Sequence, residues 1–156
     1  MMTVHSPDER TPAHYVATTI GAAFILIGLV GIWKPAFMGM HLTAAHNVIH
    51  LASGVVSLYF GLAGSAAAAR GFCFTFGAVY ALLGVAGMAF GVPGTATMTG
   101  MPPDPRFLRV LPGRLELGTM DHAIHIVIGG AYLVAGFLTH PTGVSHRRPH
   151  EAPLTS

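Results

Sequence analysis

Apolar residues run along this chain in four long blocks, separated by short polar links and by one long link. No Asp, Glu, Lys or Arg occurs between Lys34 and Arg70, between Arg70 and Asp104, or between Asp121 and Arg147. A helix needs about 20 mostly apolar residues to cross a bilayer. The pattern therefore predicts four membrane-spanning helices, over residues 15–33, 44–67, 71–92 and 120–140.

The remaining residues form tails and links around a membrane domain at 15–140. Residues 1–14 are a polar N-terminal tail, and we expect 141–156 to be a disordered C-terminal tail. The third connection, 93–119, is a long Gly- and Pro-rich loop, in which RFLRVLPGRLELG is typical of a segment along the membrane surface. The first block is longer than the apolar part of a signal peptide, which predicts a retained helix.

The blocks repeat in pairs. GAAFILIGLVG, from Gly21, matches GAVYALLGVAG, from Gly77, and HNVIHLASGVVSLYFG, from His46, matches DHAIHIVIGGAYLVAG, from Asp121. Chance similarity among common Gly, Ala and Leu residues is the alternative explanation. The shared pattern predicts an all-α polytopic membrane protein, a four-transmembrane-helix bundle made of two repeated helical hairpins.

Polar residues mark one face of the second and fourth blocks. His46 and His50 share one helix face, and Asp121 and His125 hold the matching positions on the other block. Ionisable residues inside membrane spans are costly and usually face a partner or a cavity. We therefore expect six side chains to converge at one end of the bundle: His46, Asn47, His50, Asp121, His122 and His125.

Three interpretations of this cluster remain open. The first is a structural polar clasp of Asn47, His50, Asp121 and His125, in which Asp121 bonds His50 or His125. The second is a cofactor: a transition metal with candidate ligands His46, His50, Asp121, His122 and His125, or haem b with His50 and His125 as axial ligands. The third is a proton or ligand pathway.

Two further groups of residues are weaker candidates. Thioethers and imidazole in the first and third links could bind Cu(I), through the segment 38–41 with Met98 and Met101. His140, His146 and His150 lie among Pro and Arg without helical spacing, which indicates a solvated tail. Cys73 is the single cysteine and sits in an apolar run, so it predicts a core residue and excludes an internal disulfide.

Composition agrees with a lipid-embedded protein that binds no nucleic acid. Hydrophobic residues make up 52% of the 156 residues and charged residues only 9%. The net charge is +2, and its basic residues form no patch suited to nucleic acid. Basic residues divide equally between the two membrane sides, and the short connections weakly favour cytoplasmic termini. Because the chain has no recognisable nucleophile, phosphate loop or acid pair, we expect it not to be an enzyme.

HNVIHLASG, GAVYALLGVAG and DHAIHIVIGG resemble the bacterial four-span membrane proteins of domain-of-unknown-function family 4383. The resemblance covers about residues 15–138, and its pattern positions are Asn47, His50, Gly54, Asp121, His125 and Gly129. It implies a protein of the bacterial inner membrane and supplies no activity. We expect a structural or accessory subunit of a larger membrane complex, with a metal- or haem-binding, possibly redox-active, membrane protein as the alternative.

Overall fold

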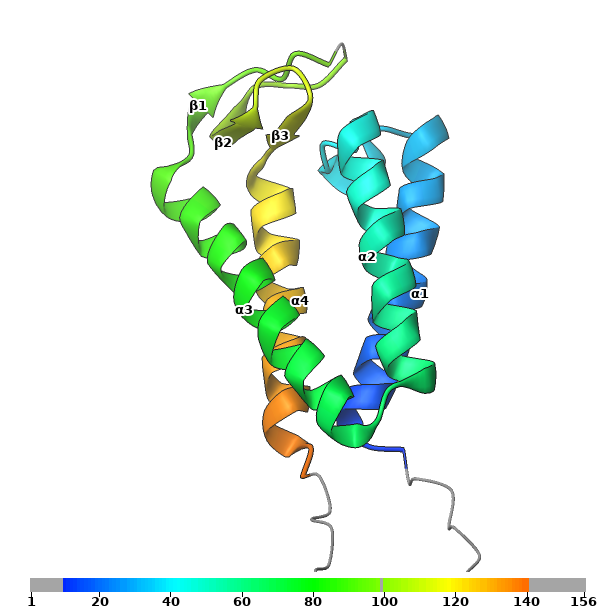
Figure 1. Ribbon diagram of the computed structural model, residues 1–156. Helices are drawn as coiled ribbons and strands as arrows, with labels where there is room; N and C mark the ends of the chain where they lie inside the picture. The colour runs from blue at the N-terminus through cyan, green and yellow to red at the C-terminus, as the bar shows by residue number, and fades with distance from the viewer. Residues whose placement is uncertain (1–9, 99, 141–156) are drawn as a thin grey trace, which may run out of the picture.

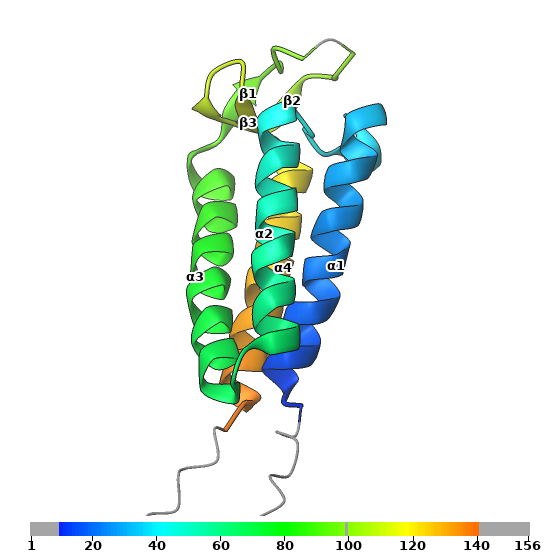
Figure 2. The ribbon, with the colours of Figure 1, turned by 45° about the vertical axis from the view of Figure 1, so that its right-hand side comes forward.

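The computed structural model describes residues 10–98 and 100–140. Within these residues the chain forms four long helices that run side by side, with a small sheet at one end (Figures 1 and 2). The predicted tail histidines His146 and His150 lie outside the described residues. In chain order the elements are α1 (Pro12–Trp33), the short 3-10 helix η1 (Phe37–Gly39), α2 (Ala44–Ala63), α3 (Ala66–Phe90), β1 (Val92–Gly94), β2 (Asp104–Leu111), β3 (Leu115–Leu117) and α4 (Thr119–Leu138).

Local capping residues explain where the helices begin. Pro12 holds the first position of α1, where a missing N–H costs nothing. The Thr43 hydroxyl accepts a hydrogen bond from the His46 backbone N–H at 3.2 Å, as expected for an N-cap. The turn between α2 and α3 lies at Gly64 and Ser65, not at Arg70 as the charge pattern suggested, because the Ser65 hydroxyl caps α3 by accepting from the Ala68 N–H.

Each hairpin packs through glycines, and the two hairpins pack in the same way. A Cβ atom at these positions would overlap the facing helix, so the backbones lie in direct contact. Equivalent glycines of the two hairpins contact equivalent residues of the facing helix. In the first hairpin the contacts are Gly21 to Gly54, Gly28 to Leu51 and Gly31 to Asn47; in the second they are Gly77 to Gly129, Gly84 to Ile126 and Gly87 to His122. The sequence repeat therefore extends to side-chain packing, with α1 against α2 and α3 against α4.

The expectation of an all-α chain misses a small antiparallel sheet in the long loop. Its strand order is β1-β2-β3, and it covers the end of the bundle where α3 ends and α4 begins (Figure 1). The segment expected along the membrane surface forms β2, a turn with Gly113 at φ 73°, and β3. The positive φ is readily adopted by glycine, so the Pro112-Gly113 pair reverses the chain between β2 and β3.

Three of the helices in the described part of the chain are long and apolar enough to cross a membrane: α1, α3 and α4. This confirms three of the four predicted apolar helices, whereas a crossing by α2 stays a prediction. Helix α2 has 20 residues, but its face toward the bundle holds His46, Asn47, His50 and Ser57. These buried polar residues lower its overall hydropathy while its outer face remains apolar, at Val48, Val55 and Leu62.

Candidate metal centre

Three imidazole rings meet inside the bundle near the sheet. His46 and His50 come from the first two turns of α2, and His125 comes from α4. Each ring offers one nitrogen, and these nitrogen atoms all lie within 4.8 Å of one another. All three side chains are buried, with exposed fractions of 3 to 4%. Among the described residues, this trio is the group of His, Cys, Asp or Glu side chains that could hold a metal ion.

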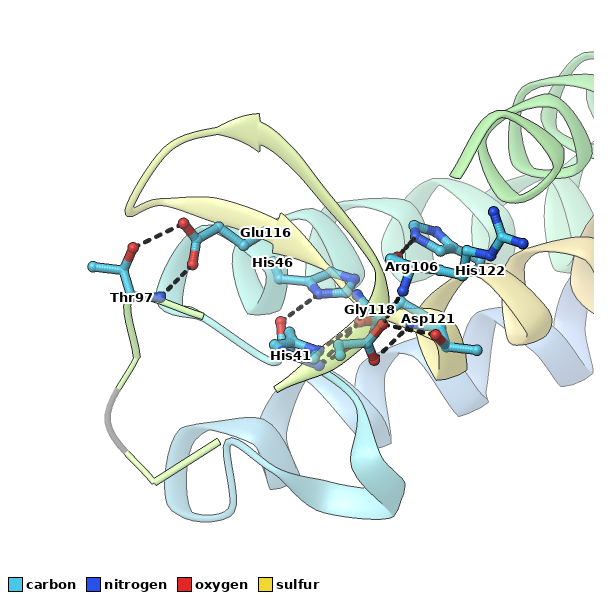
Figure 3. Close-up of polar contacts among 10 residues, drawn as sticks. His41, His46, Thr97, Arg106, Glu116, Gly118, Asp121 and His122 are labelled. Atoms are coloured by element: carbon cyan, nitrogen blue, oxygen red, sulfur yellow. Dashed lines mark hydrogen bonds and ion pairs between the residues drawn. The ribbon is translucent and has the colours of Figure 1, made fainter. Parts of the chain in front are cut away.

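Hydrogen bonding chooses the tautomer of the His46 ring. Its Nδ1 lies 2.8 Å from the carbonyl oxygen of His41, which can only accept, so Nδ1 carries the proton (Figure 3). In the neutral ring Nε2 then keeps its lone pair. Metal-binding histidines in proteins are commonly oriented by such a bond to a backbone carbonyl. His46 is therefore prepared to act as a ligand through Nε2.

His50 and His125 occupy equivalent positions in the repeat and have equivalent neighbours. The Phe24 ring packs on His50 with centroids 5.4 Å apart, and the Tyr80 ring packs on His125 at 5.3 Å. In each ring Nδ1 is buried and finds no hydrogen-bond partner among the described residues. Aromatic packing, and not a hydrogen bond at Nδ1, therefore orients these two rings. A buried polar atom left unpaired costs free energy.

The space between the rings is small. A cavity of about 10 Å³ is lined by His46, His50, Asp121 and His125, together with Phe24, Ile27, Met40, Ile124 and Ile128. Such a volume holds about one water molecule or ion. A haem between His50 and His125 does not fit this space, because a porphyrin would have to force the two rings apart.

The clasp interpretation expected Asp121 to bond His50 or His125, and the structure shows neither bond. Its carboxylate accepts hydrogen bonds from the backbone N–H groups of Gly118 at 2.8 Å and of His41 at 3.1 Å. Its Oδ2 also lies 3.2 Å from His41 Nδ1 (Figure 3). The carboxylate at the third position of α4 reaches back to the residue before its own helix, as in a capping box, so it lines the same small cavity as the imidazole trio without bonding to His50 or His125. The clasp therefore joins α4 to the first link, through His41.

Asn47 and His122 occupy matching flank positions and stay apart from the trio. Asn47 Nδ2 donates to the carbonyl oxygen of Leu42 at 3.2 Å, and His122 Nε2 lies 2.8 Å from the carbonyl oxygen of Arg106. Both side chains pack against glycines of the neighbouring helix, Gly31 and Gly87. They hold the hairpin ends together, so His122 is not placed as a ligand.

The methionines expected to bind Cu(I) are not gathered at one point. Met40 lines the small cavity beside the imidazoles. Met38 is 62% exposed, and Met98 lines a different cavity next to Gly31. Met101 is buried but lines neither cavity beside the trio, so Met40 is the one candidate thioether there, instead of the set that a copper site would need.

A larger cavity of about 220 Å³ adjoins the trio between α2 and α3. His46, His50 and His125 line it together with mostly apolar residues, and Leu115 and Leu117 of β3 close it toward the sheet. The imidazole trio thus lies between a small internal cavity and a larger side cavity. The sheet, which sequence reasoning did not predict, forms one wall of the site.

Two carboxylates hold the sheet in place. Burial alone would raise the pKa of Glu116, but hydrogen bonds from the Gly113 N–H and from the N–H and hydroxyl of Thr97, with the nearby Arg109 charge, lower it overall. The pKa of Asp104 is lowered in the same way: burial opposes ionisation, and hydrogen bonds from Thr119 and Arg106 outweigh it. Both carboxylates are outside the helices and carry their charge at neutral pH.

Sequence reasoning missed His41 as the partner of Asp121, and Tyr80 and Glu116 as parts of the site. Tyr80 had a usable signal, because it aligns with Phe24 when the first and third blocks are superimposed. Glu116 also had one, since it is the acidic residue between Leu115 and Leu117 in the LEL segment just before α4. His41 had none, because it lies in a link outside the repeat.

Comparison with known proteins gives no match to a protein-family model, to a curated protein or to a solved structure. The resemblance to the four-span bacterial family stays an expectation.

Proposed function

We propose that this chain is a membrane protein that binds one transition-metal ion through the imidazoles of His46, His50 and His125. The observation that carries the proposal is the convergence of three buried ring nitrogens within 4.8 Å from two different helices. Imidazole is a ligand suited to zinc, copper, iron and nickel. Bonds from zinc to histidine nitrogen are about 2.0–2.1 Å long, so a small inward rotation of the rings brings all three into contact with one ion.

The membrane setting supports this proposal. An imidazole trio without metal leaves two unpaired Nδ1 atoms and three lone pairs in a nearly dry interior, which is costly. Ionisable groups in membrane spans are retained mainly where they perform a task. Helix α2 brings two of the ligands, and we propose that it crosses the bilayer as the fourth span, with its polar face turned inward.

Three protein ligands leave a coordination position open. Structural zinc sites usually have four protein ligands, whereas sites that bind or convert small molecules keep one position for water or substrate. The same three histidines line both the small cavity and the side cavity, and we propose that the open position faces the side cavity, which has room for a ligand. The proposed site therefore resembles a ligand-binding centre more than a structural one.

The test is metal content in the purified full-length chain. We expect about one equivalent of metal per chain after loading with Zn²⁺ or Co²⁺ and removal of free ion, and its loss in His50→Ala and His125→Ala. Bound Co²⁺ should also give the visible absorption bands of a low-symmetry nitrogen site. His14→Gln and His122→Asn are matched controls: both remove buried histidines, and the second installs the residue that the first hairpin has at that position.

Retention of metal in His50→Ala and His125→Ala, or equal loss in the two control variants, would contradict the proposal. A well-folded wild-type chain that binds no metal would favour the clasp interpretation, in which the trio serves packing only. Assembly as an accessory subunit, non-enzymatic function and location in a bacterial inner membrane stay predictions.

A further inference from the structure

The side cavity between α2 and α3 has apolar walls and one polar end. Its walls come from α2, α3 and β3, and the apolar side chains that form them are Ile49, Phe76, Val79, Leu83, Leu115 and Leu117. At the inner end lie the three imidazoles of the proposed metal site. A molecule in this cavity would therefore be mostly apolar, with its polar group directed at the histidines.

The polar end offers both a hydrogen-bond acceptor and a hydrogen-bond donor. The lone pair on His46 Nε2 is an acceptor, because Nδ1 already carries the proton. The Ser53 hydroxyl accepts from the Tyr80 hydroxyl at 3.1 Å, and its own proton has no acceptor in the described part of the chain. A ligand hydroxyl can donate to the His46 lone pair, whereas a carbonyl oxygen can only accept.

The size and the position of the cavity restrict the rest of the ligand. An apolar protein cavity of about 150 Å³ is known to hold a benzene molecule, so about 220 Å³ has room for one substituted ring. The wall residue Val79 is 58% exposed on the outer face of α3, where the bilayer would surround it. The cavity is therefore reached from the membrane side, not from water.

We propose that the side cavity binds a membrane-dissolved phenol, quinols included, with one ring between α2 and α3 and its hydroxyl oxygen at the open position of the His46, His50 and His125 centre. The apolar substituents of such a molecule extend past Val79 into the lipid. This inference rests on the proposed metal site for the open coordination position, but a hydrogen bond to the His46 lone pair would also hold the hydroxyl without metal.

Photolabelling of the full-length chain in lipid nanodiscs tests the proposal. The probe is a phenol with a trifluoromethyl diazirine at the para position, and labelled peptides are identified by mass spectrometry. We expect label on the cavity segments 49–53 of α2 and 75–83 of α3. Unlabelled 4-hexylphenol should compete about tenfold better than hexylbenzene, which corresponds to one hydrogen-bonded hydroxyl.

Two variants separate the cavity from the lipid-facing surface. Val79→Trp fills the cavity from its outer wall and should abolish the competed label. Val134→Trp places the same side chain on the outer face of α4, where the valine is 56% exposed and lines none of the cavities described above, and should leave the label unchanged. Metal content is measured on the same preparations.

The outcomes for the two proposals can be told apart. Loss of competed label in Val79→Trp with metal retained supports the phenol site. Hydroxyl-selective labelling of a wild-type chain that binds no metal also supports it, and would contradict only the metal site. Equal competition by hexylbenzene, competition by 4-hexylphenol in Val79→Trp, or a metal-loaded wild-type chain without competed label would overturn the phenol proposal and leave the metal site standing. Selective competition by a para-quinone in place of the phenol would also overturn it.

Discussion

At the scale of single residues, backbone carbonyls decide which nitrogen His46 and His122 leave free. The His41 carbonyl takes the proton of His46 Nδ1, and the Arg106 carbonyl pairs with His122 Nε2. The first arrangement leaves a nitrogen facing the other imidazoles, whereas the second leaves Nδ1 against Gly87. Two histidines that look alike in the sequence therefore have different roles, one as a proposed ligand and one as a packing residue.

The buried Glu116 carboxylate makes the sheet sensitive to acid. Its pKa is lower in the folded protein than the ordinary value of 4.5, because the hydrogen bonds from Gly113 and Thr97 outweigh burial. A group with a lowered folded pKa contributes stability above its ordinary pKa and loses it as the pH falls through the folded value. We expect the amide of Thr97 to lose protection as the pH falls from about 6 to about 3.

Hydrogen exchange, corrected for intrinsic rates, measures this loss. Glu116→Gln should lower the protection of the Thr97 backbone amide at neutral pH. It should also remove most of the pH dependence of this protection, since the glutamine side chain has no charge to titrate. Amides in the middle of α4 serve as the internal control and should stay protected throughout. Constant protection of Thr97 in the wild-type chain down to about pH 3 would show that the carboxylate does not hold the sheet.

At the scale of elements, the helices associate through positions without a side chain. Gly129 of α4 lies against the backbone of Ala81 in α3, whereas a Cβ at the neighbouring Gly130 would meet open space. Dispersion contacts between close backbones stabilise helix pairs in lipid, where apolar burial contributes little. Adjacent glycines on one helix therefore have opposite tolerance to substitution.

The pair Gly129→Ala and Gly130→Ala tests this difference. Gly129→Ala should destabilise the chain by about 1–3 kcal/mol, because the new methyl group overlaps α3 and forces the hairpin apart. Gly130→Ala should be neutral or stabilising by up to about 1 kcal/mol, through better helix propensity. Thermal or denaturant unfolding in one detergent gives both values. Equal effects of the two variants would mean that α3 and α4 are not in contact at Gly129.

At the scale of the whole molecule, the two hairpins share their packing but differ in their chemistry. The repeat pairs His50 with His125 and Phe24 with Tyr80, and the two aromatic rings pack in a tilted arrangement across the hairpins with centroids 5.2 Å apart. His46 of the first hairpin corresponds to Asp121 of the second. One half thus supplies two imidazoles, while the other supplies one imidazole and the carboxylate that joins α4 to the first link.

Single-cysteine labelling tests whether all four helices cross the membrane. In a Cys73→Ala background, Met38→Cys and Pro112→Cys should react from one side, and Ser65→Cys from the other, because α2 has the length of about 30 Å that a crossing needs. An impermeant maleimide applied to intact cells and to opened membranes distinguishes the sides. We expect Ser65 on the cytoplasmic side. Labelling of Met38 and Ser65 from the same side would exclude a crossing by α2.

Part of the candidate site could be predicted, because helical spacing shows which residues of one helix share a face. Positions 46 and 50 share a helix face in any α-helix, and the repeat links His50 to His125. That Asp121 and His122 form their hydrogen bonds outside this trio was not predictable. Their partners are backbone groups of Gly118, His41 and Arg106, and a pattern of side chains says nothing of where a distant carbonyl or N–H will lie.

The sequence by itself determined the helical blocks and the pairing of blocks into hairpins. These follow from local periodicity and from the absence of charge, which act within one segment or between copies of it. Only the tertiary structure decided that β2 and β3 cover the bundle, that the Asp121 carboxylate pairs with His41, and that a cavity lies beside the imidazoles. These features depend on residues far apart in the chain, whose contact is set by how the two hairpins pack and not by any local pattern.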